Sequence, residues 1–213
     1  MSCKKVFWEN PYLTELSTTI TSVMGDTITV SETIFYAFSG GQQSDSGTIG
    51  TYEVIEASKV GKEIYYKLIP EHRLRSGESV HMIIDWEKRY RLMRLHFAAE
   101  LVLEWVYQNY GHPEKVGANI SEDKARVDFK WDGNINLIFP ALEAALKRLI
   151  HENHEITSAF SDPESEQRYW KILGFSQVPC GGTHIKATGE IGDVKLSRRN
   201  IGGGKERIEI TLK

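Results

Sequence analysis

Short runs of apolar and β-branched residues, separated by polar turn residues, make up the first part of the chain. Residues 18–33 are rich in β-branched side chains and are interrupted by Met24-Gly25-Asp26, which predicts a hairpin. A glycine- and serine-rich stretch and two strand-like runs follow, at residues 39–47, 52–58 and 63–68. Several short strands with turn signals are typical of a small barrel. We therefore expect a small, β-barrel-like N-terminal domain over residues 1–86, which carries the glycine-rich stretch.

The pattern then changes to the period of an α-helix. From Trp86 to about Tyr110, apolar residues recur every three or four positions, as in the run Leu92, Leu95, Ala99, Leu103 and Val106. Gly111 and Pro113 predict the end of this helix.

The remaining residues predict two shorter helices among strands. One helix follows Pro140 to about His151, and another is expected over residues 163–173. Residues 121–131 and 189–213 are interpreted as strands, the latter joined at Gly202-Gly203-Gly204. The fold class is therefore α+β. We expect a second domain, residues 87–213, to be an antiparallel sheet with packed helices.

Composition and charge narrow the class of protein. A charged fraction of 26% and a hydrophobic fraction of 40% are ordinary for a globular protein. No apolar run approaches the roughly 18 residues of a membrane span, so a cytoplasmic protein is expected. The net charge of −3 argues against a general nucleic-acid coat. Two local basic clusters stand out, and either could equally be a solvated surface: Lys88, Arg89, Arg91 and Arg94, then Lys195, Arg198, Arg199, Lys205 and Arg207.

Two pairs of side chains are spaced for metal binding. His96 and Glu100 lie four residues apart on the apolar stripe of the long predicted helix, where a carboxylate needs an ion-pair partner or a metal. Cys180 and His184 are also four apart, in a glycine-containing turn, and sulfur with nitrogen suits zinc. The alternative for the helix pair is a buried ion pair of Glu100. The alternative for Cys180 and His184 is that the two residues lie in turns without a shared function. The two pairs together favour one metal centre.

At this point the chain resembles a known family, the editing domains of alanyl-tRNA synthetases and their stand-alone relatives, the AlaX proteins. The helix around His96 is similar to the H-x3-H helix of that family, and residues 180–184 match its C-G-G-T-H motif, which threonyl-tRNA synthetases share. Further matching segments are residues 35–42 with Asp45 and Gly47, residues 188–192, and residues 204–209. Two positions depart from the pattern: Glu100 replaces the second histidine of the helix, and Ser44 stands where glycine is usual.

The resemblance implies a trans-editing hydrolase that deacylates mischarged tRNA(Ala), seryl-tRNA(Ala) above all and in some members glycyl-tRNA(Ala). It implies Zn2+ held by His96, Cys180, His184 and Glu100, although Glu100 would alternatively be a catalytic base or a sign of altered activity. Thr33, Gln42 and Thr183 are expected to bind the substrate. The positions expected to contact the RNA of the acceptor end are Arg94, Lys195, Arg198 and Arg199.

Other functions stay open on the sequence. They are an editor of a different aminoacyl-tRNA, another metal-dependent hydrolase, and a non-catalytic RNA-binding module with a closed, structural zinc. The sequence does not determine the oligomeric state.

Overall fold

The structure, a computed structural model, describes residues 3–213, and the chain forms two compact units. The N-terminal unit comprises the residues up to Ser39 together with Gln43–Tyr90. The C-terminal unit comprises Gly40–Gln42 and Arg91–Lys213. Three residues of the glycine-rich stretch therefore belong to the C-terminal unit, far from it in sequence.

The N-terminal unit is built almost entirely of strands. Its elements are β1 (Lys4–Lys5), α1 (Val6–Glu9), β2 (Glu15–Met24), β3 (Thr27–Val30), β4 (Glu32–Thr33), β5 (Gly47–Ile49), β6 (Tyr52–Glu53), β7 (Glu56–Val60), β8 (Glu63–Lys67) and β9 (Ser79–Ile84). The hairpin predicted at Met24-Gly25-Asp26 is confirmed, since β2 and β3 pair antiparallel across that turn. Buried Ile28, Tyr66 and Met82 come from three different strands and fill one core.

Seven of these strands form one antiparallel sheet in the order β6-β5-β9-β2-β3-β8-β7. The sheet curls into a half-barrel, and within the described residues β6 and β7 remain at its two edges. The chain between them turns from one edge to the other, because the Val54 amide donates to Gly47 O and the Ile55 amide donates to Lys67 O. The strand-rich N-terminal part is thus present, whereas a closed small barrel is not shown.

The C-terminal unit contains the long helix and two smaller sheets. Its elements are most of α2 (Trp86–Asn109), β10 (Lys115–Ile120), β11 (Ala125–Lys130), a 3-10 helix η1 (Ile135–Ile138), α3 (Phe139–Glu152), β12 (Thr157–Asp162), β13 (Gln167–Ile172), β14 (Ser176–Pro179), a second 3-10 helix η2 (Thr188–Ile191), β15 (Val194–Gly202) and β16 (Lys205–Leu212). Within the described residues no helix is both long and apolar enough to span a membrane.

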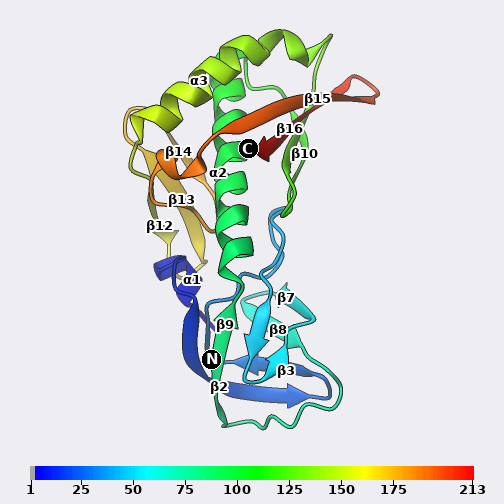
Figure 1. Cartoon of the computed structure of the whole chain (residues 1–213), viewed down its shortest axis with the longest axis vertical. Helices are drawn as coiled ribbons and strands as arrows, with labels where there is room; N and C mark the ends of the chain where they lie inside the picture. Colours follow the sequence, from blue (N-terminus) through cyan, green and yellow to red (C-terminus); the bar gives the residue numbers. More distant parts are fainter. Residues whose placement is uncertain (1–2) are drawn as a thin grey trace. The chain divides into compact units, whose positions relative to one another are not determined.

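Helix α2 lies between the two sheets of this unit (Figure 1). On one side is the three-stranded sheet β12-β13-β14, where the ring of Phe97 packs edge-on against Trp170 at 5.2 Å. On the other is the four-stranded sheet β10-β11-β16-β15, where Tyr107 meets Phe129. A helix packed on both sides is buried along most of its length, so polar side chains on it are enclosed.

The predicted helix over residues 163–173 is wrong. The chain there makes a turn and then strand β13, which pairs with β12 and β14. Arg168, Trp170 and Ile172 are buried while Gln167 and Lys171 are exposed, which is the period of two of a strand. Glutamates and serine after Pro163 resemble a helix start, but they form the hairpin turn instead.

Candidate metal centre

Helix α2 carries two polar side chains into its packed interface. His96 is buried and Glu100 is nearly so, one helical turn away. Their spacing places both on one face of the helix, and the Glu100 Oε1 atom lies 3.2 Å from His96 Nε2. The sequence prediction that these two residues share a face therefore describes a real contact.

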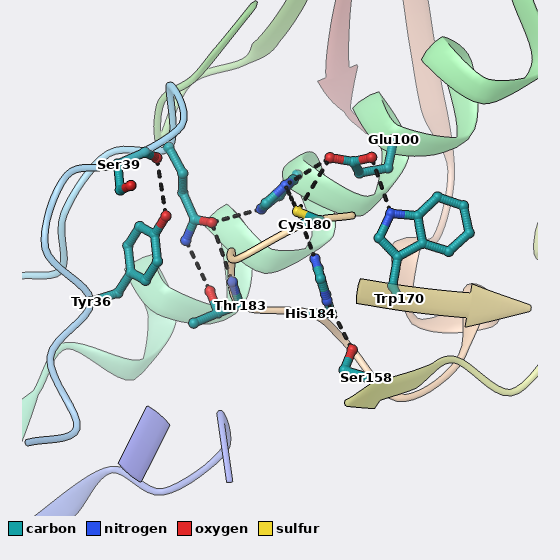
Figure 2. Close-up of polar contacts among 10 residues, drawn as sticks. Tyr36, Ser39, Glu100, Ser158, Trp170, Cys180, Thr183 and His184 are labelled. Atoms are coloured by element: carbon teal, nitrogen blue, oxygen red, sulfur yellow. Dashed lines mark hydrogen bonds and ion pairs between the residues drawn. The ribbon is translucent and has the colours of Figure 1, made fainter. Parts of the chain in front are cut away.

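The loop that follows β14 brings two more donor atoms to the same place. Its start is fixed because the amide of Cys180 donates to the carbonyl oxygen of Arg168 on β13, at 2.9 Å. Cys180 Sγ then lies 3.4 Å from His96 Nε2 and 3.3 Å from His184 Nε2. Figure 2 shows Cys180 between Glu100 and His184. The two predicted pairs, 84 residues apart between His96 and Cys180, thus meet in one cluster.

Both histidines turn Nε2 to the cluster and hold the other ring nitrogen in a hydrogen bond. His96 Nδ1 lies 2.6 Å from Gln42 Oε1, and His184 Nδ1 lies 2.9 Å from Ser158 Oγ. The Thr183 amide, which can only donate, also reaches Gln42 Oε1, so this atom is an acceptor and His96 Nδ1 carries a proton. Hydrogen bonds of this kind orient imidazole ligands and leave the Nε2 lone pair for a metal.

The three donors of His96, Cys180 and His184 lie within 4.8 Å of one another. Zinc bonds of about 2.0–2.3 Å place tetrahedral ligand atoms about 3.3–3.6 Å apart, so contacts of 3.3 and 3.4 Å to sulfur fit a shared ion. Sulfur and imidazole nitrogen are also the donor set that zinc prefers. The residues present therefore fit a metal of this type.

Glu100 lies beside that set rather than fully within it. Its Oε1 atom is 3.5 Å from Cys180 Sγ, and its Oε2 atom accepts a hydrogen bond of 3.0 Å from the indole of Trp170. The carboxylate is thus held in place by Trp170 from β13 and directed at the cluster, within reach of two of the three donors.

Burial and charge set the protonation of the cluster without metal. Burial lowers the pKa of His96, but the negative charge of Cys180 and Glu100 and their hydrogen bonds outweigh it and raise the pKa to about 10. Burial lowers the pKa of His184, and the charge on His96 lowers it further. Burial raises the pKa of Glu100, but the hydrogen bond and charge of His96 dominate and lower it. At neutral pH the metal-free cluster therefore holds a proton that a metal would displace.

Residues 188–192, one of the further segments that match the family, support the end of the loop. Thr188 Oγ1 donates to Leu149 O of α3 and accepts from the amide of His154. Arg94 of α2 donates to Ile191 O through two nitrogens at 2.8 and 3.0 Å. These contacts tie the residues after His184 to both helices, which is a structural role for the motif.

The other sequence-based site residues have different surroundings. Thr33 is buried in the N-terminal unit, where its hydroxyl lies 2.6 Å from Tyr66 Oη and accepts the amide of Phe35. Thr183 is buried beside the cluster, and its hydroxyl accepts from Gln42 Nε2 at 2.9 Å. The candidate RNA contacts Lys195, Arg198 and Arg199 are exposed on β15, and Arg94 is half-buried.

Sequence reasoning missed two residues that contact the cluster, Ser158 and Trp170. Alternation along β13 would have put Trp170 on the same buried face as Ile172, but it could not show which side chain faces it. Nothing near Ser158 in the sequence indicates its contact with His184. Both are long-range contacts that only the fold creates.

The fold and the cluster define a class: a mixed α+β protein in which a helix and a glycine-containing loop present imidazole and thiol donors to one candidate metal centre. Residues 169–209 match the sequence model of the threonyl and alanyl tRNA synthetase second additional domain. The chain is 34% identical to the alanyl-tRNA editing protein AlaX-M of Pyrococcus horikoshii, over 98% of this chain and 97% of that protein. It is 30% identical to AlaX-M of Methanosarcina acetivorans, over 94% and 95%.

A larger relative shows the same relationship. The alanine–tRNA ligase of Ignicoccus hospitalis is 32% identical over 97% of this chain, which covers 25% of the ligase. From these matches, the chain belongs to the family of AlaX-M alanyl-tRNA editing proteins.

Proposed function

We propose that this protein is a zinc-dependent hydrolase that removes wrongly attached amino acids from tRNA(Ala) in trans, with seryl-tRNA(Ala) as the main substrate and glycyl-tRNA(Ala) as a second one. Family membership supports the reaction class. The observation that carries the proposal is the convergence of His96 Nε2, Cys180 Sγ and His184 Nε2, with the outer nitrogen of each imidazole held by a hydrogen bond.

In this proposal His96, Cys180 and His184 hold Zn2+. The ion would polarise the ester carbonyl or lower the pKa of the attacking water. Three mutually close protein donors favour this reading over a structural zinc, because structural sites are closed by four protein ligands whereas catalytic sites keep a position open.

Glu100 is the residue for which the geometry leaves two roles. Its carboxylate lies next to the donors, and its lowered pKa keeps it ionised at neutral pH, which both a ligand and a base require. Its Oε1 atom lies 3.2 Å from His96 Nε2 and 3.5 Å from Cys180 Sγ, which are distances between ligands of one ion, so it would alternatively complete the ligand set. We propose the base role, because Oε1 lies outside the set of mutually close donors and the Trp170 indole holds Oε2 away from them.

Recognition of the amino acid is proposed for the polar side chains beside the cluster. Thr183 and Gln42 are buried next to His96, and the Thr183 hydroxyl keeps a proton to donate while it accepts from Gln42. A polar group of this kind suits a serine hydroxyl. Thr33 remains a sequence-based candidate for the same role.

Editing is needed because the pocket in which a synthetase binds alanine discriminates poorly against the smaller glycine and against serine, which adds only a hydroxyl. A second, hydrolytic site corrects the errors. An editor with this task would act in the cytoplasm, as part of protein biosynthesis, on the acceptor end of the tRNA.

The test is deacylation of seryl-, glycyl- and alanyl-tRNA(Ala) by the purified protein, with chelator and with zinc restored. We expect loss of serine, slower loss of glycine, sparing of alanine, and no activity of Cys180→Ala. Seryl-tRNA(Ser) is included to separate an editor that is specific for tRNA(Ala) from a general deacylase. If a folded, zinc-loaded sample leaves all four esters intact, the proposed reaction is wrong.

A further inference from the structure

The outward face of the four-stranded sheet in the C-terminal unit is strongly basic. Strand alternation puts Val127, Ile208 and Ile210 on the face toward α2, where they are buried. The opposite face carries, in register, Arg126, Asp128 and Lys130 of β11, Lys205, Arg207, Glu209 and Thr211 of β16, and Lys195, Ser197 and Arg199 of β15. Six of these ten residues are Lys or Arg and two are acidic, in a chain whose net charge is −3.

Two cross-strand pairs on this face join like charges. Lys130 lies opposite Lys205, and Arg199 lies opposite Arg207. Directly opposed side chains have Cβ atoms about 4.5–5.5 Å apart, and like charges there are destabilising. Within the described residues Lys205 and Arg199 form no ion pair, and Lys130 has only a loose contact of 3.9 Å with Glu114. Repulsion between like charges on this face therefore lowers the stability of the folded protein.

The centre of the face is ordered by one carboxylate. Asp128 accepts hydrogen bonds of 2.8 and 2.9 Å from the Arg207 guanidinium and also binds Arg126. The two guanidinium groups are thus fixed before any ligand arrives, and preorganised cations bind an anion at a smaller entropic cost. Around them stand the lysines and Arg199, which are exposed.

We propose that this outward sheet face, defined by Lys130, Lys205, Arg207 and Arg199, binds the sugar–phosphate backbone of tRNA. The identity of the partner rests on the proposed function. Phosphates would neutralise the opposed cations and so relieve the repulsion between them, which is present in the protein without tRNA.

The sheet also connects this face to the metal centre. Gln42, whose side chain contacts His96, makes a β-bridge with Ile120 at the end of β10, and the Ile120 amide donates to Gly41 O at 2.8 Å. The segment that reaches the cluster is thus an extension of the sheet's β10 edge. The sheet and the metal centre are therefore joined through this edge, and the tRNA on which the metal centre is proposed to act is the polyanion assigned to the face.

The two faces of β15 divide the basic residues of that strand. Arg199 and Lys195 lie on the outward face, whereas Arg198 alternates to the other face and binds Glu206 through two hydrogen bonds of 2.5 and 2.6 Å. Arg94 donates to Ile191 O. The phosphate contacts are therefore assigned to the outward face and not to Arg198 or Arg94.

The first experiment measures the affinity for a tRNA(Ala) transcript without an attached amino acid, as a function of salt concentration. It compares the wild type with Lys130→Gln, Arg199→Gln and Lys205→Gln, singly and combined. Each phosphate contact contributes roughly 0.7–0.9 to the slope of log affinity against log salt. We expect several-fold weaker binding for each single variant and a slope reduced by about two for the triple variant. The control is the double variant Arg148→Gln, Lys171→Gln, at exposed positions of α3 and β13, which should keep the wild-type slope.

A second variant separates function from folding. Lys205→Glu creates an opposite-charge pair with Lys130, so its Tm at low salt should equal or exceed that of the wild type while its tRNA affinity falls at least tenfold. An unchanged salt slope in the triple variant, or wild-type tRNA affinity of a folded Lys205→Glu protein, would overturn the proposal. The transcript carries no amino acid, so its binding is measured independently of deacylation. Failure of the proposed hydrolysis therefore does not alter the binding result, and failure of binding does not decide the test of hydrolysis.

Discussion

A Cβ atom placed on Gly182 would lie 2.0 Å from Cε1 and 2.6 Å from Nδ1 of His96. The imidazole of His96 therefore rests directly on the backbone of the loop that carries Cys180 and His184. The neighbouring Gly181 differs, because a Cβ atom there would meet nothing within 4 Å. Of the two glycines in the C-G-G-T-H segment, only Gly182 is required by the close approach of His96.

The first prediction follows from this contact. Gly182→Ala should displace His96 and weaken zinc binding by on the order of 10- to 100-fold, the range seen when the groups that orient a ligand are lost. Gly181→Ala is the matched control and should bind zinc nearly as the wild type does. Zinc affinity by competition with a chromophoric chelator, with Tm to verify folding, is the measurement. Equal affinity of the two variants would contradict the packing argument.

The second prediction concerns Glu100. If this residue is the base, Glu100→Gln keeps stoichiometric zinc and loses deacylation by about 10²- to 10⁴-fold, the usual contribution of general acid–base catalysis. If it is a ligand, zinc content falls together with activity. Zinc by elemental analysis and single-turnover deacylation distinguish the two outcomes. Glu100→His, which restores the H-x3-H pattern of the family, should retain zinc in either case.

Trp170 provides an independent check on Glu100. Trp170→Phe keeps the ring packed on Phe97 but removes the N–H that holds Glu100 Oε2. A positioning role predicts a lower deacylation rate at unchanged zinc content, by a similar factor from neutral to alkaline pH, because Glu100 stays ionised over that range and only its position changes. A variant with wild-type rates at every pH would show that the indole hydrogen bond does not matter.

Much of the fold could be predicted from the sequence, because its strongest patterns are local. The periodicity from Leu92 to Val106 defines α2 whatever packs on it, and Gly25 and Gly203 mark turns by their need for positive φ. The prediction for the segment after Pro163 was wrong because its turn residues resemble a helix start. The alternation of Arg168, Trp170 and Ile172 already indicated a strand.

In the candidate site too, the local relationships could be predicted from the sequence and the long-range contacts could not. Spacing alone brought out His96 with Glu100 and Cys180 with His184, because each pair is local. The sequence did not indicate that the amide oxygen of Gln42 contacts His96, and the substrate role expected for Gln42 stays a prediction. Contacts over 54 residues, or between Ser158 and His184, depend on how the sheets pack on α2 and have no local signature.

A further prediction addresses the N-terminal unit. Arg89 is fully buried and donates to Asp45, to Pro11 O and to Ile34 O, while Asp45 also accepts the Tyr36 amide. Arg89→Met would leave Asp45 buried without its charge partner, so we expect a loss of about 3–5 kcal/mol in the free energy of unfolding. Lys88→Met, at the half-buried neighbouring position, is the control and should cost under about 1 kcal/mol. Urea unfolding measures both, and equal losses would show that the ion pair is not important.

The last prediction concerns protons in the metal centre. Because negative charge at Cys180 and Glu100 raises the pKa of His96 to about 10, the metal-free cluster is protonated at pH 7. Without metal, the raised pKa stabilises the fold fully below the unfolded value of about 6.5, and this contribution is lost as pH rises toward 10.

Zinc has the opposite dependence, because it competes with that proton for the Nε2 lone pair. Zinc binding at pH 7 should therefore release at least one proton, and its affinity should rise by about one log unit or more per pH unit between pH 6 and pH 8. Calorimetric titration in buffers of different ionisation enthalpy counts the protons, and the increase in Tm on adding zinc should be larger at pH 8 than at pH 6. A pH-independent affinity would mean that His96 is already neutral at pH 7 and that Cys180 and Glu100 do not hold its proton.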